Sequence, residues 1–541
     1  MRHHLGVAIA LFPPIVSLVL LTASHPGLTQ SSPETRLPAP PRVFIDTSYR
    51  APSGRTIPLA KNGDLQAALK TAQPGDVIVL EPGATFQGNF SLPKKAGSGW
   101  IVLRTGAPDE QFPPAGTRVN PTSASLMPKL VSPNGNPAVY TESGAHHYRF
   151  IGIEFTTTTT VKDIYSIVAF GGEQTSDAES PSDLILDRCY VHGQPETMSR
   201  RGVLLNSASS AVIDSYVSEI HAAGYDSQAL LGYNGRGPFK IVNNYLEATT
   251  ENLMFGGADP KIRDLVPSDI EIRRNHLFKP LRWRPGDPSF AGVNWPIKNL
   301  LELKNAQRVL IEGNLLENNW GGATLVLTPR NQDGTAPWSV VQDVLFRSNI
   351  VKNALGGFSL QTSDDEHSSQ PTKRIALVNN AWGVTRTFFG LTSGRGGTPE
   401  DLLIDHNTAI PSGYSAYYIE VGPTQPAMIR FRLTNNLIGF GSYGVGSPKG
   451  DPKWLPGATI ARNALVSLAD FGDGQGSVRN RPPDIDQAMY TSFPNAAAAG
   501  LNQDGTLTPK SPNRRAGTDG KDIGVDFDEL LRAYTGQLPP K

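Results

Sequence analysis

The sequence is poor in cysteine and in charge. Its 541 residues include one cysteine, Cys189, so the chain cannot close an internal disulfide or build a cysteine-based metal site. Lys and Arg together number 49, as do Asp and Glu, and only 18% of the residues are charged. Nucleic acids and anionic membranes are held by a basic excess, so neither is an expected partner.

Long apolar runs are also missing, apart from one at the N-terminus. Leu5 to Leu21 is apolar, is interrupted by Pro13-Pro14 and is followed by small residues. It is a poor membrane span and predicts a secretory signal peptide over residues 1–30. We therefore expect a secreted or periplasmic protein that begins with a disordered, proline-rich lead over residues 31–42.

Glycine and proline are abundant, with 54 and 45 residues, which is typical of a turn-rich chain. A short pattern recurs, in which apolar and polar residues alternate, reach a small polar residue and then resume. This position, called here the asparagine slot, is occupied by Cys189, Ser215, Asn244, Asn275, Asn314, Asn349, Asn380, Asn407, Asn436 and Asn463. Successive slots are 26 to 39 residues apart. Alternation indicates strands, and self-similarity at this period indicates a solenoid or a propeller.

The repeat lacks the Trp-Asp signature of propeller blades and the leucine-rich consensus of horseshoe repeats. It favours an all-β coil in which each turn holds about three short strands. Asparagines in successive turns can then bond to one another inside a bend. The segment GDLQAALKTAQPGDVIVL predicts an amphipathic capping helix before a first strand at 77–80. We expect the coil over residues 43–470 and a C-terminal tail and cap over 471–541.

On these segments the sequence resembles the pectate-lyase-like superfamily of right-handed parallel β-helices. The capping segment, the strand FIGIEF, the asparagine slots and the closing segment LNQDGTLTPKSPNRRAGTDGKDIGVDF carry the resemblance. It spans about residues 43 to 528. It implies the fold and an association with polysaccharides, but this scaffold carries lyases, hydrolases, epimerases and adhesins.

An apolar strand also precedes each asparagine slot, and the ends of these strands are rich in polar groups. The residues there are Asn206, Asn234, Asp259, Glu302, Lys304, Arg330, Asp364, Asp365, Arg395 and Glu420. Neighbouring strands lie about 4.8 Å apart, so these groups should form one stripe of mixed charge. Such a stripe suits an extended acidic polysaccharide, and we expect a monomer that binds one.

The chemistry that fits this stripe is β-elimination from a uronate. The enzyme must neutralise the substrate carboxylate and supply a base. We predict Lys304 as the base, Arg330 as the group that stabilises the enolate or assists the leaving group, and Asp259 and Glu302 as ligands of a metal or the substrate. Ca²⁺ is the expected metal, since it prefers carboxylate oxygens. The Glu, Lys and later Arg resemble the chondroitinase B and alginate lyase branch, although Arg330 lies in TPRN rather than in Arg-His-Gly.

Further polar and aromatic residues are predicted to bind the polysaccharide. Some lie in a dense polar patch, some flank the slot at Asn275 in IEIRRNHLFKP, and two tryptophans lie in the 39-residue interval, where they could stack on sugar rings. They are Asp226, Gln228, Arg273, His276, Lys279, Trp283, Trp295 and Arg395.

Two other functions remain open. Asp364 and Asp365 could be the carboxylate pair of a polygalacturonase-type glycoside hydrolase, although the other motifs of that family are not in register. A non-catalytic glycan-binding adhesin would need the stripe and the tryptophans, but no base.

Overall fold

A computed structural model describes residues 34–410, 419–421, 426–440, 445–446, 455–467 and 489–536. The predicted signal peptide lies outside the described residues. Within the described residues, no helix has the length and apolar character that a bilayer crossing requires.

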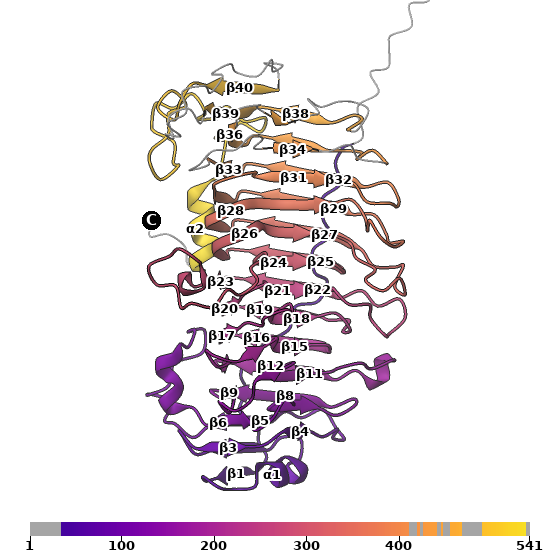
Figure 1. The fold of residues 1–541 in the computed structure, drawn as a ribbon, viewed down its shortest axis with the longest axis vertical. Coiled ribbons are helices and arrows are strands. Elements are labelled where there is room, and N and C mark those ends of the chain that lie inside the picture. The colour runs from indigo at the N-terminus through magenta and orange to yellow at the C-terminus, as the bar shows by residue number, and fades with distance from the viewer. Residues whose placement is uncertain are drawn as a thin grey trace, which may run out of the picture. The chain divides into compact units, whose positions relative to one another are not determined.

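The strands stack in three columns, and the first column forms a sheet of its own (Figure 1). Every pairing in it is parallel, as in β12 with β8 and β16. In stacking order its strands are β1 (Thr56–Leu59), β2 (Val77–Leu80), β5 (Ile101–Thr105), β8 (His146–Ile151), β12 (Ser182–Asp187), β16 (Ala208–Ile213), β19 (Phe239–Val242), β22 (Ser268–Arg273), β25 (Ala306–Glu312), β27 (Val341–Arg347), β29 (Lys373–Val378), β32 (Glu400–Asp405), β35 (Arg432–Thr434) and β38 (Thr459–Ala461).

The second column follows the asparagine slots. Its strands are β3 (Thr85–Gln87), β6 (Lys129–Ser132), β9 (Glu154–Thr157), β13 (Tyr190–His192), β17 (Tyr216–Ile220), β20 (Tyr245–Ala248), β23 (His276–Phe278), the first parts of β26 (Leu315–Leu327) and β28 (Ile350–Gln361), β30 (Ala381–Val384), β33 (Thr408–Ala409), β36 (Leu437–Phe440), β39 (Asn463–Ser467) and β40 (Tyr490–Phe493). Since β40 pairs with β39, the stack continues beyond residue 470, where we expected the coil to end.

The third column precedes the next strand of the first. It holds β4 (Phe90–Leu92), β7 (Val139–Thr141), β11 (Val168–Phe170), β15 (Arg201–Leu205), β18 (Gln228–Gly232), β21 (Glu251–Phe255), β24 (Leu301–Leu303), the second parts of β26 and β28, β31 (Phe389–Thr392), β34 (Ile419–Val421) and β37 (Val445–Gly446). A short pair, β10 (Asp163–Ile164) with β14 (Met198–Ser199), lies beside it. Each turn of the chain thus passes once through every column, and apolar side chains from all three fill one continuous core. The chain is an all-β parallel β-helix, as predicted.

The asparagine slots form the predicted ladder at the corner between the first and second columns. From Asn275 to Asn463, the Oδ1 of each asparagine accepts hydrogen bonds from the backbone N–H and the Nδ2 of the asparagine one coil below, at 2.8–3.2 Å. The Oδ1 of Asn244 accepts from the backbone N–H of Ser215 at 2.9 Å. Ser215 ends the ladder, because its Oγ accepts from the Cys189 N–H at 2.9 Å. The ladder satisfies backbone groups that the bend would otherwise leave unpaired.

A short helix covers the N-terminal end of the described stack. At the N-terminal end, α1 (Leu65–Thr71) begins at Asp64, whose side chain accepts a hydrogen bond from the Ala67 N–H, and it buries Leu65 and Leu69 over the first coils. This is the predicted capping helix. It covers strand edges that would otherwise be open to pairing with another chain.

The proline-rich lead differs from the prediction, because residues 34–48 are ordered along the outer side of the first column (Figure 1). The N–H groups of Arg36, Ala39 and Arg42 donate to Asp401, Asp343 and Asp269, respectively, at 2.8–2.9 Å. Successive acceptors are two coils apart, about 9.6 Å, and three residues of polyproline II span about 9.3 Å. The lead is therefore held in register by every second coil.

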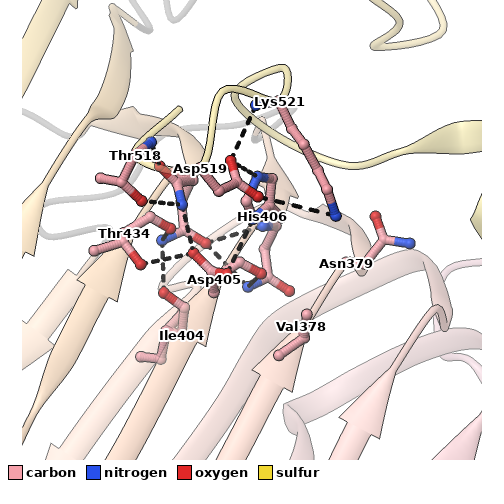
Figure 2. A network of polar contacts seen from close by, with 12 residues as sticks. Val378, Asn379, Ile404, Asp405, His406, Thr434, Thr518, Asp519 and Lys521 are labelled. Carbon is pink, nitrogen blue, oxygen red and sulfur yellow. Dashed lines mark hydrogen bonds and ion pairs between the residues drawn. The ribbon is translucent and has the colours of Figure 1, made fainter. Parts of the chain in front are cut away.

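The C-terminal segment runs back along the corner of the asparagine ladder and ends in α2 (Phe527–Thr535). Figure 2 shows one of its attachment points, where Asp519 approaches His406, at 3.6 Å, and Lys521. His406 Nδ1 in turn bonds to Asp405, which accepts a hydrogen bond from Thr434 at 2.6 Å. Short 3₁₀ turns at Pro121–Leu126, Asp177–Glu179 and Leu281–Trp283 complete the described elements.

Candidate active site

A strip of polar side chains runs across β18, β21 and β24 of the third column. Gln228 and Glu251 are opposite each other in register at the starts of β18 and β21. One coil further on, Asn299 lies two residues before β24, and Glu302 lies within it. All four side chains are at most 6% exposed.

The four side chains bring buried oxygens together. The Nε2 of Gln228 donates to Glu251 Oε2 at 2.7 Å, and the Nδ2 of Asn299 donates to Glu302 Oε2 at 3.0 Å. Gln228 Oε1, Glu251 Oε1 and Asn299 Oδ1 accept no hydrogen bond, although they are buried. Each buried oxygen without a hydrogen bond costs about 1–3 kcal/mol, so a cation or a hydrogen-bond donor placed among the three would stabilise the cluster.

The charge around Glu251 is unbalanced. Burial and the neighbouring carboxylates of Glu302 and Asp226 raise the pKa of Glu251. Lys298 opposes this from 3.6 Å and bonds to Asp226 at 2.7 Å. Although burial disfavours the charged amine, Glu251 and Asp226 together raise the pKa of Lys298. One partly exposed lysine thus serves two carboxylates.

Lys304 and Arg330 lie next to this cluster. Lys304 directly follows β24, and its Nζ is 3.4 Å from Glu302 Oε1. The Arg330 N–H donates to the Lys304 carbonyl at 2.9 Å, so the two residues are neighbours one coil apart, as predicted. A Cβ at Gly256, whose φ is 91°, would come within 2.9 Å of the Lys304 Cβ. Glycine at this position leaves room for the lysine.

Arg330 is already surrounded by acids. Its guanidinium lies 3.0 Å from Asp364, 3.1 Å from Asp365 and 3.7 Å from Glu366. Asp364 is fully buried and also accepts from the backbone N–H groups of Asn331 and Glu366. A carboxylate held in this way cannot serve as one of two solvent-facing acids, which weighs against the hydrolase alternative.

Asp259 and Arg395 lie near the strip in different settings. Asp259 Oδ2 accepts three hydrogen bonds from Asp333 and Thr335, so this carboxylate holds the turn after Arg330. Arg395 follows β31, is exposed, and donates its backbone N–H to the Asp364 carbonyl. Among the described residues, no three His, Cys, Asp or Glu side chains form a metal-binding group.

Three predicted substrate contacts lie elsewhere. Arg273 pairs with Glu312 at 2.7 Å on the first column, and His276 pairs with Glu317 at 3.0 Å on the second. The prediction for Lys279 is wrong, because its side chain is completely buried. Its Nζ donates to Asn252 Oδ1 and to three backbone carbonyls at 2.9–3.0 Å, and burial lowers its pKa to about 7.

The prediction for Trp283 is also wrong, since its ring is only 2% exposed. Trp283 packs edge-on against His221, and Trp295 stacks on the same imidazole at 4.2 Å. Arg282, in the same loop, forms ion pairs with Glu219 and Glu247. The loop in the long interval therefore packs around His221, and we call it the clamp. The C-terminal end of this loop places Lys298 and Asn299 beside Glu251.

Asn299, Lys298 and Glu251 were not predicted as site residues. A signal for them exists, because aligning NLLEL with ENLMF places Asn299 opposite Glu251. The 39-residue interval obscures this alignment in the sequence.

A separate cavity lies under the C-terminal segment. It has about 620 Å³ and is lined largely by apolar residues such as Trp382, Leu501 and Phe527. Asp504 is the one ionisable residue that lines it, and its carboxylate accepts a hydrogen bond from the Thr506 hydroxyl. The strip therefore offers more groups that could act as a general acid or base than this cavity does.

No protein-family model and no curated protein matches the chain. Among solved structures, the chain is similar to the PL6 family alginate lyase AlyGC, with 14% identity, a TM-score of 0.53, and coverage of 90% of this chain and 60% of that chain. A mannuronic acid specific polysaccharide family 6 lyase from human gut microbiota has 12% identity and a TM-score of 0.47 over 82% of this chain and 92% of its own. Pectate lyase Pel9A has 14% identity and a TM-score of 0.34, with coverage of 87% and 96%.

The likeness to AlyGC establishes the fold. The chain is a right-handed parallel β-helix. It spans about 60% of the length of the AlyGC chain.

Proposed function

We propose that this protein is a polysaccharide lyase that cleaves a uronate-containing polysaccharide by β-elimination. The observation that carries the proposal is the adjacency of Lys304 and Arg330, one coil apart, to a buried cluster of carboxylate and amide oxygens, three of which accept no hydrogen bond. That AlyGC is named an alginate lyase supports the reaction class.

Lys304 would act as the base. Its amine takes the proton from C5 of the uronate, the bond between C4 and the glycosidic oxygen breaks, and a C4–C5 double bond forms. The departing oxygen takes up a proton, and Arg330 on the next coil is placed to assist this step. Lys304 must first give up its contact with Glu302, and both side chains leave the same end of β24.

Ca²⁺ would be held by Gln228, Glu251, Asn299 and Glu302. Two carboxylates and two amide oxygens are hard ligands of the kind that Ca²⁺ prefers, and three of the oxygens accept no hydrogen bond. When bound, the ion would neutralise the substrate carboxylate. Asp259, which we predicted as a ligand, instead serves the turn that carries Arg330.

The proposal extends to location. The apolar segment at residues 5–21 supports export, where a monomeric lyase meets extracellular polysaccharide.

The test compares Lys304→Ala with Lys352→Ala. Lys352 is 60% exposed and pairs with Glu317 on the second column, so it is a matched loss of charge away from the strip. Each variant and the wild type are assayed at about 235 nm, where unsaturated uronates absorb, on alginate, pectate and glycosaminoglycans, with Ca²⁺ and with chelator.

We expect Lys304→Ala to lose about 10³-fold in kcat, since a general base contributes 10²–10⁴-fold, while Lys352→Ala stays within twofold. Retained polysaccharide binding by Lys304→Ala would separate catalysis from binding. If the wild type binds but yields no unsaturated product on any uronate polymer, the adhesin alternative replaces the lyase.

A further inference from the structure

Arg201 extends the strip on the side opposite to Arg330. It begins β15 and is in register with Gln228 on β18, which is in register with Glu251 on β21. Arg201 therefore lies two coils below Glu251 and three coils below Lys304, or about 10 Å and 14 Å along the stack.

The charge state of Arg201 sets it apart from the other cations of the strip. Lys304, Arg330 and Lys298 all contact carboxylates, and the neighbouring Arg200 pairs with Asp163. No carboxylate of the described residues lies within 4.0 Å of the Arg201 guanidinium. Its Nε is buried without an acceptor. Arg201 thus carries a positive charge that the described part of the protein leaves uncompensated.

A tyrosine holds this guanidinium in place. The Arg201 Cζ lies 4.4 Å from the centre of the Tyr165 ring, and Tyr165 is 47% exposed. Stacking on an aromatic ring fixes the plane of the guanidinium without using its N–H groups. One coil further on, Tyr225 is 51% exposed, and Arg200 stacks over it at 3.6 Å.

We propose that Arg201, oriented by Tyr165, is a carboxylate-binding subsite for a uronate residue remote from the cleaved bond. This inference rests on the proposed function and adds a position to it. A planar guanidinium pairs with a carboxylate through two parallel hydrogen bonds, and a compensating carboxylate is what this arginine lacks. Because Arg201 is about three coils from Lys304, it contributes to binding and not to the chemical step.

The experiment uses Arg201→Gln, Arg201→Lys and Tyr165→Ala in the full chain, with Arg236→Gln as the matched control. Arg236 loses the same charge but pairs with Asp177 on the surface. KM and kcat are measured on the uronate polymer that the wild type cleaves. Retardation in gels that contain alginate, polygalacturonate or neutral dextran measures binding independently of cleavage.

For Arg201→Gln we expect KM, and the dissociation constant from retardation, to rise about tenfold, with kcat within twofold and no change on dextran. Arg201→Lys keeps the charge but loses the planar guanidinium that makes two parallel hydrogen bonds, so its KM and dissociation constant should rise less. Tyr165→Ala should resemble Arg201→Lys, and Arg236→Gln should match the wild type. If Arg201→Gln unfolds, the lysine and Tyr165 variants carry the test.

The outcomes separate the two proposals. Cleavage with unchanged KM in Arg201→Gln overturns the subsite and leaves the lyase standing. Retardation by alginate or polygalacturonate that depends on Arg201, without cleavage, overturns the lyase and supports the subsite. A wild type that neither cleaves nor is retarded overturns both.

Discussion

Two edges of the same coil use polar residues in opposite ways. At the corner of the asparagine ladder, one residue type recurs at each coil and every side chain satisfies the next, as Asn349 does for Asn314. On the strip of the third column, each coil contributes a different side chain, from Gln228 through Glu251 to Glu302, and buried oxygens are left without donors. The ladder pairs the polar groups of the fold with one another, whereas the strip leaves buried oxygens at the place where we propose that Ca²⁺ binds. Mutations at the two edges should therefore separate stability from activity.

The largest effect on stability is expected in the ladder. Asn314→Ala removes the acceptor of the Asn275 backbone N–H and one of the two acceptors of its Nδ2, which keeps the Ile241 carbonyl. The two lost hydrogen bonds should cost about 3–5 kcal/mol of unfolding free energy, while kcat of the folded fraction stays within twofold. Urea unfolding measures the loss, with the exposed Asn294→Ala as control. Equal effects of the two variants would remove the structural role of the ladder.

The strip should respond to metal instead. Millimolar Ca²⁺ is expected to stabilise the wild type by about 2–3 kcal/mol at a hundredfold excess over Kd, which thermal unfolding would show as a rise of a few degrees in Tm. Glu251→Gln should abolish the rise. Glu317→Gln should keep the rise, because Glu317 is a partly buried carboxylate on the second column, away from the strip. A rise that persists in Glu251→Gln would place the ion elsewhere.

The strip should also make the stability of the protein depend on pH. Burial and neighbouring carboxylates raise the pKa of Glu251, so the fold favours its neutral form. The stability of the chelated protein that depends on this group is present at acid pH and is lost as pH rises through the raised pKa. The chelated Glu251→Gln variant should therefore gain on the wild type between pH 4 and 8, as followed by urea unfolding. A constant difference over that range would contradict the assignment.

The smallest effect is expected at the end of the ladder. The Ser215 side chain makes one ladder bond, in which its Oγ accepts from the Cys189 N–H, and its hydroxyl donates to the Ile213 carbonyl. Ser215→Ala should cost about 1 kcal/mol in the same unfolding experiment, well below Asn314→Ala. A loss as large as that of Asn314→Ala would mean that the ladder does not work bond by bond.

Much of the fold could be predicted because it repeats. The slots from Asn244 to Asn463 keep one spacing band and one residue type, so the stacking of coils followed from the sequence. The neighbouring positions of Lys304 and Arg330 followed from the same register. The lead at 34–42 could not be predicted, since its order depends on aspartates two coils apart in the folded stack.

The remaining contacts of the site depend on side-chain paths that no local pattern encodes. Lys279 and Trp283 lie near the start of the longest interval, yet the fold buries both side chains. Lys298 and Asn299 lie at the other end of that interval, and the clamp around His221 brings them to Glu251.

The sequence by itself determined the coil, its capping helix and the asparagine ladder, because periodic alternation and a recurring amide leave few other ways to bury the apolar residues and pair the backbone. Only the tertiary structure decided which oxygens of the strip lack partners, which cations are already neutralised, and that Arg201 is not. These properties depend mostly on distances between residues tens of positions apart, which the stacking of coils sets and the linear order does not contain.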